Sequence, residues 1–291
     1  MACGCHRCDS LPGGSSSTKV YSTFAPQTAE ERGTASGCGV MEQAIESRVL
    51  ETTDGRGEVR RFEVVVPSGV RPGEPKALTF VFHGADGGSN SARAMGLEAV
   101  PGAREASFFV YPVGVPFGRQ GIGWDDTCGG YDMVFFDHML SEIRKRYCVD
   151  SRRVFAAGFS WGADFVTALL CCRGDRLRAV APASCSDEYA VATDHKTYAN
   201  YPCPSRSSAA IRFTHDANGD SGYSLAQFET TRRLYQEFNG CSQVSTAALQ
   251  ASCVSYVGCR EPFIACGYTA LGHAIPRTWA SDTWAFFSTF H

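Results

Sequence analysis

The chain has 291 residues and a mass of 31.4 kDa, which allows one or two domains of ordinary size. Its 27 lysines and arginines against 30 acidic residues give a formal charge of −3, which argues against a protein that binds nucleic acid. Hydrophobic residues make up 44% and charged residues 20%, so the composition excludes global disorder. No apolar run approaches the roughly 18 residues of a membrane-spanning helix.

Fourteen cysteines are many for a reduced cytosolic protein and are typical of an exported one, so the sequence predicts a secreted protein with disulfides. The even count permits full pairing but does not fix its connectivity. We expect most of the eleven cysteines from Cys38 onward to be paired, without a bond between adjacent Cys171 and Cys172. No signal peptide is visible, and we interpret Met1 as the start of a trimmed chain.

The first 37 residues differ in composition from the rest. Cys3, Cys5, His6 and Cys8 form one crowded cluster, which is followed by a glycine- and serine-rich stretch. A structural zinc site usually needs two separated ligand pairs, so we expect disulfides or a disordered tail here and no metal site. The predicted division is a tail over 1–37 and a single domain over 38–291.

From residue 36 onward, short apolar strands alternate with helices. The segment 77–82 is a continuous apolar run, as expected of a strand buried on both faces. Segment 132–146 has apolar residues three and four apart, which predicts a helix with one buried face. The alternation predicts an α/β fold with a mainly parallel sheet and helices on both faces. The remaining expected strands are 60–66, 107–111, 153–157, 177–182, 209–214 and 262–268, and the remaining helices are 163–170, 225–238 and 278–290.

A G-x-S-x-G motif lies at 158–162, between an expected strand and an expected helix. In that context the glycines permit a strained turn that exposes Ser160 at a helix N-terminus, which predicts a nucleophile; the alternative is a structural glycine turn. A serine nucleophile needs a histidine base that follows it in the chain. Of the later histidines, His273 lies in the loop between the last strand and the last helix, where such a base is expected, and a plain surface histidine is the alternative.

The acid that orients the base should follow the strand 209–214. Asp216 and Asp220 both qualify by position, and either could instead be a turn residue. For the oxyanion hole we predict the backbone N–H groups of Trp161 and Ala85, in the glycine-rich turn after 77–82. His83, in the same turn, is interpreted as structural rather than as a second base.

These motifs together resemble the extracellular carbohydrate esterases of family 1, which include feruloyl esterases, acetyl xylan esterases and poly(hydroxybutyrate) depolymerases. The resemblance runs from about residue 37 to 290 and implies an α/β-hydrolase fold. It also implies Asp220 as the acid, although this acid stands one residue later than in the usual pattern. A second departure is Asp164, a charge where the family more often has a small or apolar residue. The matching segments are 82–84, 87–88, 123–125, 132–137, 148–150, 153–162 and 272–276.

The resemblance implies a serine esterase that acts through an acyl-enzyme, with feruloyl esters of plant cell walls as the first expectation. Acetyl xylan and polyester substrates are alternatives, and an acyltransferase or a non-catalytic binding protein on the same fold are alternatives of another class. Trp124, Trp161 and Tyr223 are the expected substrate-contacting aromatics, by analogy and loop position. We expect a monomer without cofactor, whose partner is a small ester or an ester-substituted polysaccharide.

Overall fold

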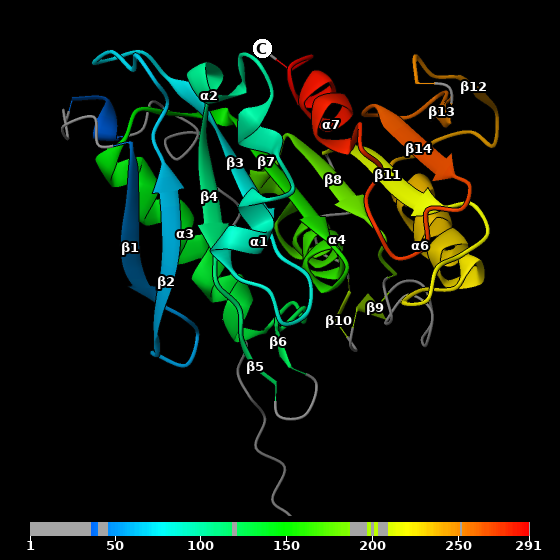
Figure 1. Ribbon diagram of the computed structural model, residues 1–291, viewed down its shortest axis with the longest axis horizontal. Helices are drawn as coiled ribbons and strands as arrows, with labels where there is room; N and C mark the ends of the chain where they lie inside the picture. Colours follow the sequence, from blue (N-terminus) through cyan, green and yellow to red (C-terminus); the bar gives the residue numbers. More distant parts are fainter. Residues whose placement is uncertain are drawn as a thin grey trace, which may run out of the picture.

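The computed structural model describes residues 36–39, 46–117, 121–186, 197–198, 201–202, 209–250 and 252–290. Its centre is a ten-stranded sheet, in which six parallel strands lie between antiparallel pairs at both edges (Figure 1). This arrangement confirms the mainly parallel sheet. In spatial order the strands are β1 (Ser47–Thr53), β2 (Val59–Val65), β4 (Ser107–Pro112), β3 (Lys76–Phe82), β7 (Val149–Phe159), β8 (Ala179–Ala183), β11 (Ala210–Asp216), β14 (Phe263–Tyr268), β13 (Cys253–Tyr256) and β12 (Ser245–Ala247).

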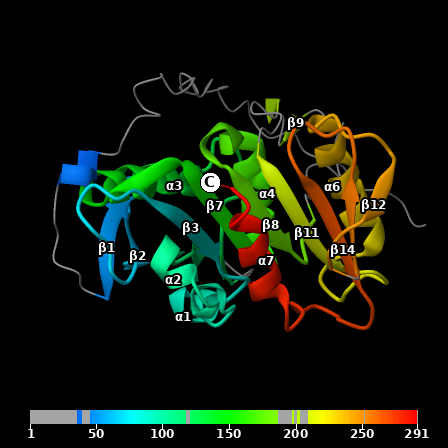
Figure 2. The same cartoon turned by 90° about the horizontal axis from the view of Figure 1, so that it is seen from above.

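Helices cover both faces of this sheet, as Figure 2 shows from above. On one face lie α3 (Tyr131–Arg146), α4 (Trp161–Arg173) and α6 (Leu225–Phe238), and on the other α1 (Ser89–Arg93), α2 (Ala103–Ala106) and α7 (Trp279–Phe287). Short elements complete the described chain: η1 (Ser36–Gly39), η2 (Leu97–Ala99), η4 (Gly174–Arg176), β5 (Val115–Pro116), β6 (Ile122–Gly123), β9 (Thr197–Tyr198) and β10 (Tyr201–Pro202).

The buried side chains form two clusters, one under each layer of helices. Phe80, Phe136 and Phe165 belong to the cluster under α3 and α4, and Trp279 and Phe287 to the cluster under α7. Because side chains alternate along a strand, each central strand contributes to both clusters, and β4, β8 and β11 are buried along their whole length. The sheet is therefore a rigid base, and the loops at the carboxyl ends of its parallel strands carry the candidate site.

Nine of the ten cysteines in the described residues are disulfide-bonded, which confirms the prediction of disulfides. Four of the disulfides join Cys38 to Cys148, Cys128 to Cys172, Cys241 to Cys259 and Cys253 to Cys266, and Cys171 is bonded as well. The cluster of the expected tail, at 3–8, lies outside the described residues. None of the helices that the structure describes combines the length and apolarity needed to cross a membrane.

Candidate active site

Ser160 occupies a sharp turn between β7 and α4. Its φ of 56° and ψ of −131° lie outside the regions that non-glycine residues prefer, so the turn is strained, as a nucleophile elbow requires. A Cβ at Gly158 would collide with the backbone of Gly162, and one at Gly162 with the carbonyl oxygens of Phe82 and His83. Both motif glycines are therefore required by close packing around the serine.

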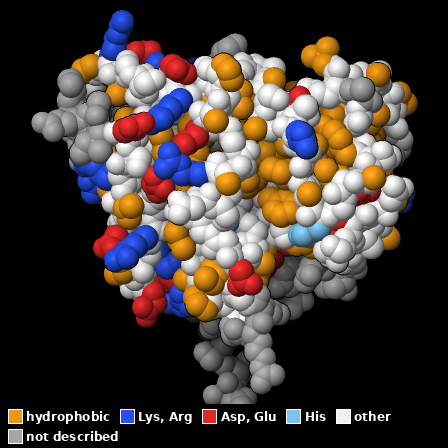
Figure 3. Space-filling model, viewed as in Figure 1, with side chains coloured by type: hydrophobic (Ala, Val, Ile, Leu, Met, Phe, Trp, Pro, Cys, Tyr) orange, Lys and Arg blue, Asp and Glu red, His pale blue; other side chains and the backbone are white. Residues whose placement is uncertain are grey.

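His273 lies beside this serine. Its Nε2 is 2.9 Å from the Ser160 Oγ, and its ring centroid is 4.9 Å from that of Phe159. The loop between β14 and α7 that carries His273 turns through positive φ at Ala270 and Gly272. Figure 3 shows a histidine at the edge of a hollow lined by hydrophobic side chains on this face of the molecule.

Asp220 lies on the other side of the imidazole. Its Oδ1 is 3.2 Å from His273 Nδ1, although that N–H is not aligned closely enough to count as a hydrogen bond. The same oxygen accepts hydrogen bonds from the N–H groups of Gly222, at 2.8 Å, and Tyr223, at 2.6 Å. Burial alone would raise the pKa of Asp220, but the N–H of Tyr223, the neighbouring His273, the N–H of Gly222 and Ser184 together outweigh burial and lower it. Asp220 is thus a buried, ionised carboxylate at neutral pH.

Asp216, the alternative acid, has a different contact. Its Oδ2 accepts from the N–H of Gly272 at 2.7 Å, and its Oδ1 from that of Asn218 at 2.8 Å. These backbone N–H donors lower its pKa, with that of Asn218 making the largest contribution. Asp216 therefore holds the backbone next to His273, and the structure places Asp220, not Asp216, against the imidazole.

The turn after β3 approaches the serine closely. A Cβ at Gly84 would lie 3.1 Å from the Cβ of Ser160, so a larger residue would push this turn away. Ala85 follows Gly84 in this turn, and Trp161 follows Ser160 as the first residue of α4. The turn is fixed to β6, because Asp86 and Ile122 exchange hydrogen bonds of 2.8 and 2.9 Å. The residues predicted for the oxyanion hole thus belong to the two segments that meet at the serine.

His83 has the structural role expected from the sequence. Its Nδ1 is 2.7 Å from the Gly84 carbonyl oxygen, and its Nε2 accepts from the N–H of Gly114 at 2.9 Å. Burial lowers the pKa of His83, so the ring stays neutral and joins two loops.

The three aromatic residues expected to contact substrate differ in burial. Trp124 is only 1% exposed, donates its indole N–H to the His83 carbonyl and stacks on Phe165, so the expected contact of Trp124 with substrate is wrong. The indole ring of Trp124 can pack into the core because its only polar atom, the ring nitrogen, has a hydrogen-bond acceptor there. Trp161 and Tyr223 are half-buried beside the serine and histidine.

Sequence reasoning missed three residues that support this site. Gly222 lies directly over the imidazole, since a Cβ there would be 2.7 Å from the His273 Cε1. Ser184, in the left-handed region at φ 51°, helps to lower the pKa of Asp220, and its hydroxyl donates to the Ala274 carbonyl at 3.4 Å. Asp164 accepts the phenol of Tyr223. Only Asp164 gave a signal in the sequence, as a charge at an unexpected place.

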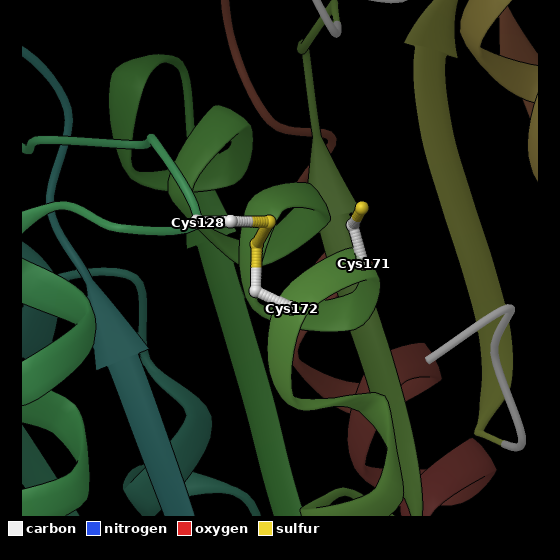
Figure 4. Close-up of side chains that lie close together, drawn as sticks. All are labelled: Cys128, Cys171 and Cys172. Carbon is white, nitrogen blue, oxygen red and sulfur yellow. A yellow bond between two sulfur atoms is a disulfide. The ribbon is translucent and has the colours of Figure 1, made fainter. Parts of the chain in front are cut away.

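The one group of candidate metal ligands in the described residues consists of cysteine sulfurs. Cys128, Cys171 and Cys172 bring their Sγ atoms within 4.8 Å of one another. Figure 4 shows the bond between Cys128 and Cys172, with the Cys171 sulfur pointing away from that pair. All three are disulfide-bonded and offer no thiolate, so this group is a structural cross-link.

No protein-family model matches the sequence. Feruloyl esterase C of Emericella nidulans is 33% identical over 138 residues, which are 44% of this chain and about half (48%) of that relative. Probable feruloyl esterase C of Aspergillus flavus is 27% identical over 267 residues, 87% of this chain and 90% of the relative. An acetyl xylan esterase from Aspergillus awamori superposes with a TM-score of 0.65 at 16% identity, over 82% of this chain and 99% of that one, and confirms the α/β-hydrolase fold.

Proposed function

Since the chain belongs with the feruloyl and acetyl xylan esterases of carbohydrate esterase family 1, within the α/β-hydrolase superfamily, we propose that it is a secreted serine carboxylic ester hydrolase. Feruloyl esters of plant cell walls are the proposed substrate class, with a monomeric enzyme that needs no cofactor. One observation carries the proposal: Ser160, His273 and Asp220 lie in consecutive contact, at 2.9 and 3.2 Å, on loops at the carboxyl edge of the sheet.

The reaction follows from these contacts. The Ser160 Oγ attacks the ester carbonyl while His273 Nε2 takes its proton, and the ionised Asp220 stabilises the imidazolium through Nδ1. His273 then gives the proton to the leaving alcohol, so that the acyl group remains on Ser160. Water attacks this acyl-enzyme with the same base and releases the acid.

The oxyanion formed in each step is proposed to accept hydrogen bonds from the amides of Trp161 and Ala85. Trp161 is the first residue of α4, so its N–H has no acceptor within the helix and lies at the positive end of the helix dipole. The exchange of hydrogen bonds between Asp86 and Ile122 keeps the second amide in place before substrate arrives. Such preorganised donors stabilise the transition state more than the ground state.

The preference for an aromatic acyl group has two supports. Relatives that match most of the chain are named feruloyl esterases. The half-buried Trp161 ring lies 5.2 Å from that of Phe117 and packs on Gly123, next to the nucleophile. A planar phenolic acid could stack on such a surface, and Tyr223 offers a second ring beside His273. The disulfides support secretion, because they persist in oxidising compartments.

The test compares kcat/KM for methyl ferulate, p-nitrophenyl acetate and a soluble hydroxybutyrate oligomer in the wild type and in Ser160→Ala. We expect methyl ferulate to be the best substrate and Ser160→Ala to lose about 10⁴-fold or more in kcat. A preference for acetate would assign the protein to acetyl esterases, and cleavage of the oligomer to depolymerases. Transfer to an added alcohol in place of water would indicate an acyltransferase. Full activity in folded Ser160→Ala would refute the serine mechanism.

A further inference from the structure

Asp164 is a buried carboxylate that the proposed reaction does not use. It lies in the first turn of α4, four residues after Ser160, and is only 7% exposed. Burying a carboxylate costs free energy unless hydrogen bonds compensate it. The partners of Asp164 therefore indicate what this residue does.

Asp164 connects three segments of the chain. One carboxylate oxygen accepts the O–H of Tyr223, and the other accepts the N–H of Ser186, which follows β8, at 3.0 Å. Tyr223 belongs to the loop between β11 and α6, the same loop that carries Asp220. The carboxylate thus ties the helix of the nucleophile to the loop of the acid.

The loop of the acid lies at the surface of the protein, and most of its own hydrogen bonds join residues within the loop or its two ends. Its residues 217–224 are half-buried or exposed, and it contains Gly219 and Gly222. Asp220 and Tyr223 close a turn within it, since the Asp220 N–H donates to the Tyr223 carbonyl at 3.0 Å and the Tyr223 N–H donates back to the Asp220 carboxylate at 2.6 Å. Whatever fixes Tyr223 therefore fixes the carboxylate that faces His273.

We propose that the Asp164–Tyr223 hydrogen bond is a clamp that positions Asp220 against His273, so that Asp164 and Tyr223 are positioning residues for the catalytic acid. The clamp closes a ring of contacts that runs from Ser160 through α4, Asp164, Tyr223, Asp220 and His273 back to Ser160. This inference rests on the proposed function, because it assigns a role within that same site.

The protonation of Tyr223 suits such a clamp. Burial, together with the negative charge of Asp164, raises the pKa of the phenol well above its ordinary value. The O–H group therefore stays protonated and remains a donor at neutral pH. A hydrogen bond to a charged acceptor is also stronger than one between neutral groups.

The test uses Asp164→Ala, which leaves the Tyr223 hydroxyl beside Ser160 in place, and Tyr223→Phe, which removes that hydroxyl. Each should lower kcat about 10- to 100-fold for p-nitrophenyl acetate and methyl ferulate alike, with KM nearly unchanged, because a misplaced acid impairs every substrate. The double variant should be little worse than either single one. Asp164→Asn keeps an oxygen for the phenol and should retain more activity than Asp164→Ala.

Tyr235→Phe is the matched control, because it also removes a buried phenol that joins α6 to α4, in a hydrogen bond of 2.6 Å to the Thr167 carbonyl. It should keep wild-type kcat. A second readout is the far-downfield proton signal of an imidazole N–H held by a carboxylate, which should persist in Tyr235→Phe and weaken in Tyr223→Phe.

The outcomes separate the clamp from its alternatives. An increase in KM for methyl ferulate alone, with normal kcat for both esters, would overturn the clamp and make Tyr223 a substrate contact. An unchanged proton signal and kcat in Tyr223→Phe would also overturn it. A wild type that hydrolyses no ester would refute the proposed function, while the proton signal would still test whether the clamp orders Asp220 and His273.

Discussion

Gly222→Ala is expected to disable the site by adding one methyl group. In the structure that methyl would lie 2.7 Å from the Cε1 of His273 and 2.8 Å from its Nδ1. Ordinary contacts between such atoms are about 3.5 Å or longer, so the ring or the loop must move by roughly 0.8 Å. Either movement changes the contacts of His273 with Ser160 and Asp220 together, since both are made by the same ring.

The expected loss is about 10²-fold in kcat, the usual cost of misplacing a reacting group by about 1 Å. This corresponds to about 2.7 kcal/mol of transition-state stabilisation. Stability should be preserved, because Gly222 is exposed and its φ is not in the left-handed region. The measurement is kcat for p-nitrophenyl acetate together with the melting temperature.

Gly267→Ala provides the control, since it makes the same change at the end of β14 where the nearest atom is 3.4 Å away, an ordinary contact. It should leave kcat and the melting temperature near wild type. Wild-type kcat in Gly222→Ala would refute the reasoning, because the imidazole would then not need the position that Gly222 allows. An equal loss in both variants would show that any added methyl near this loop is harmful.

Two further predictions concern the acidic residues of the site. Asp220→Asn should lower kcat by about 10⁴-fold, whereas Asp216→Asn should cost much less, because an amide oxygen can still accept the Gly272 N–H; steady-state rates that reverse this order would exchange the two roles. The pKa of Asp220 is lower in the folded state than in the unfolded state, where it is about 4. Ionised Asp220 therefore stabilises the fold above about pH 4, and this contribution is lost as the pH falls through the folded-state pKa. The difference in unfolding free energy between wild type and Asp220→Asn, from denaturant titrations, should therefore shrink between about pH 5 and pH 3, and a constant difference would contradict this assignment.

The sequence was sufficient where the structure is local. The turn around Ser160 depends on Gly158 and Gly162, a strand before and a helix after, all within residues 149–173. The strands β3 and β4 were visible as apolar runs because both of their faces are buried. Edge strands such as β1 gave no such pattern, since most of their residues are partly exposed, and β1, β12 and β13 were not predicted.

Tertiary contacts decided what the sequence left open or assigned wrongly. Aromatic residues occur both in cores and in binding sites, so only the burial of Trp124 shows that it belongs to the core. The choice between Asp216 and Asp220 depends on where the loop of His273 lies, which no spacing along the chain encodes. The strand expected at 153–157 is shorter than β7, and the helix expected at 278–290 is longer than α7. The ends of strands and helices are set by packing and capping rather than by periodicity.

The two aspartates after β11 show how the fold divides the work of holding one histidine. Asp216 ends the strand, so its carboxylate is fixed by the sheet and reaches the backbone N–H of Gly272, one residue before the imidazole. Asp220 faces the ring itself but stands on the loop after the strand, four residues beyond its end. A site of this kind needs a second attachment for that loop, and the buried carboxylate of Asp164 supplies one from the helix that also presents Ser160. Both the acid and the nucleophile are then attached to α4. A small movement of α4 would therefore shift both residues together, and it would change the distance between them less than a movement of either loop alone.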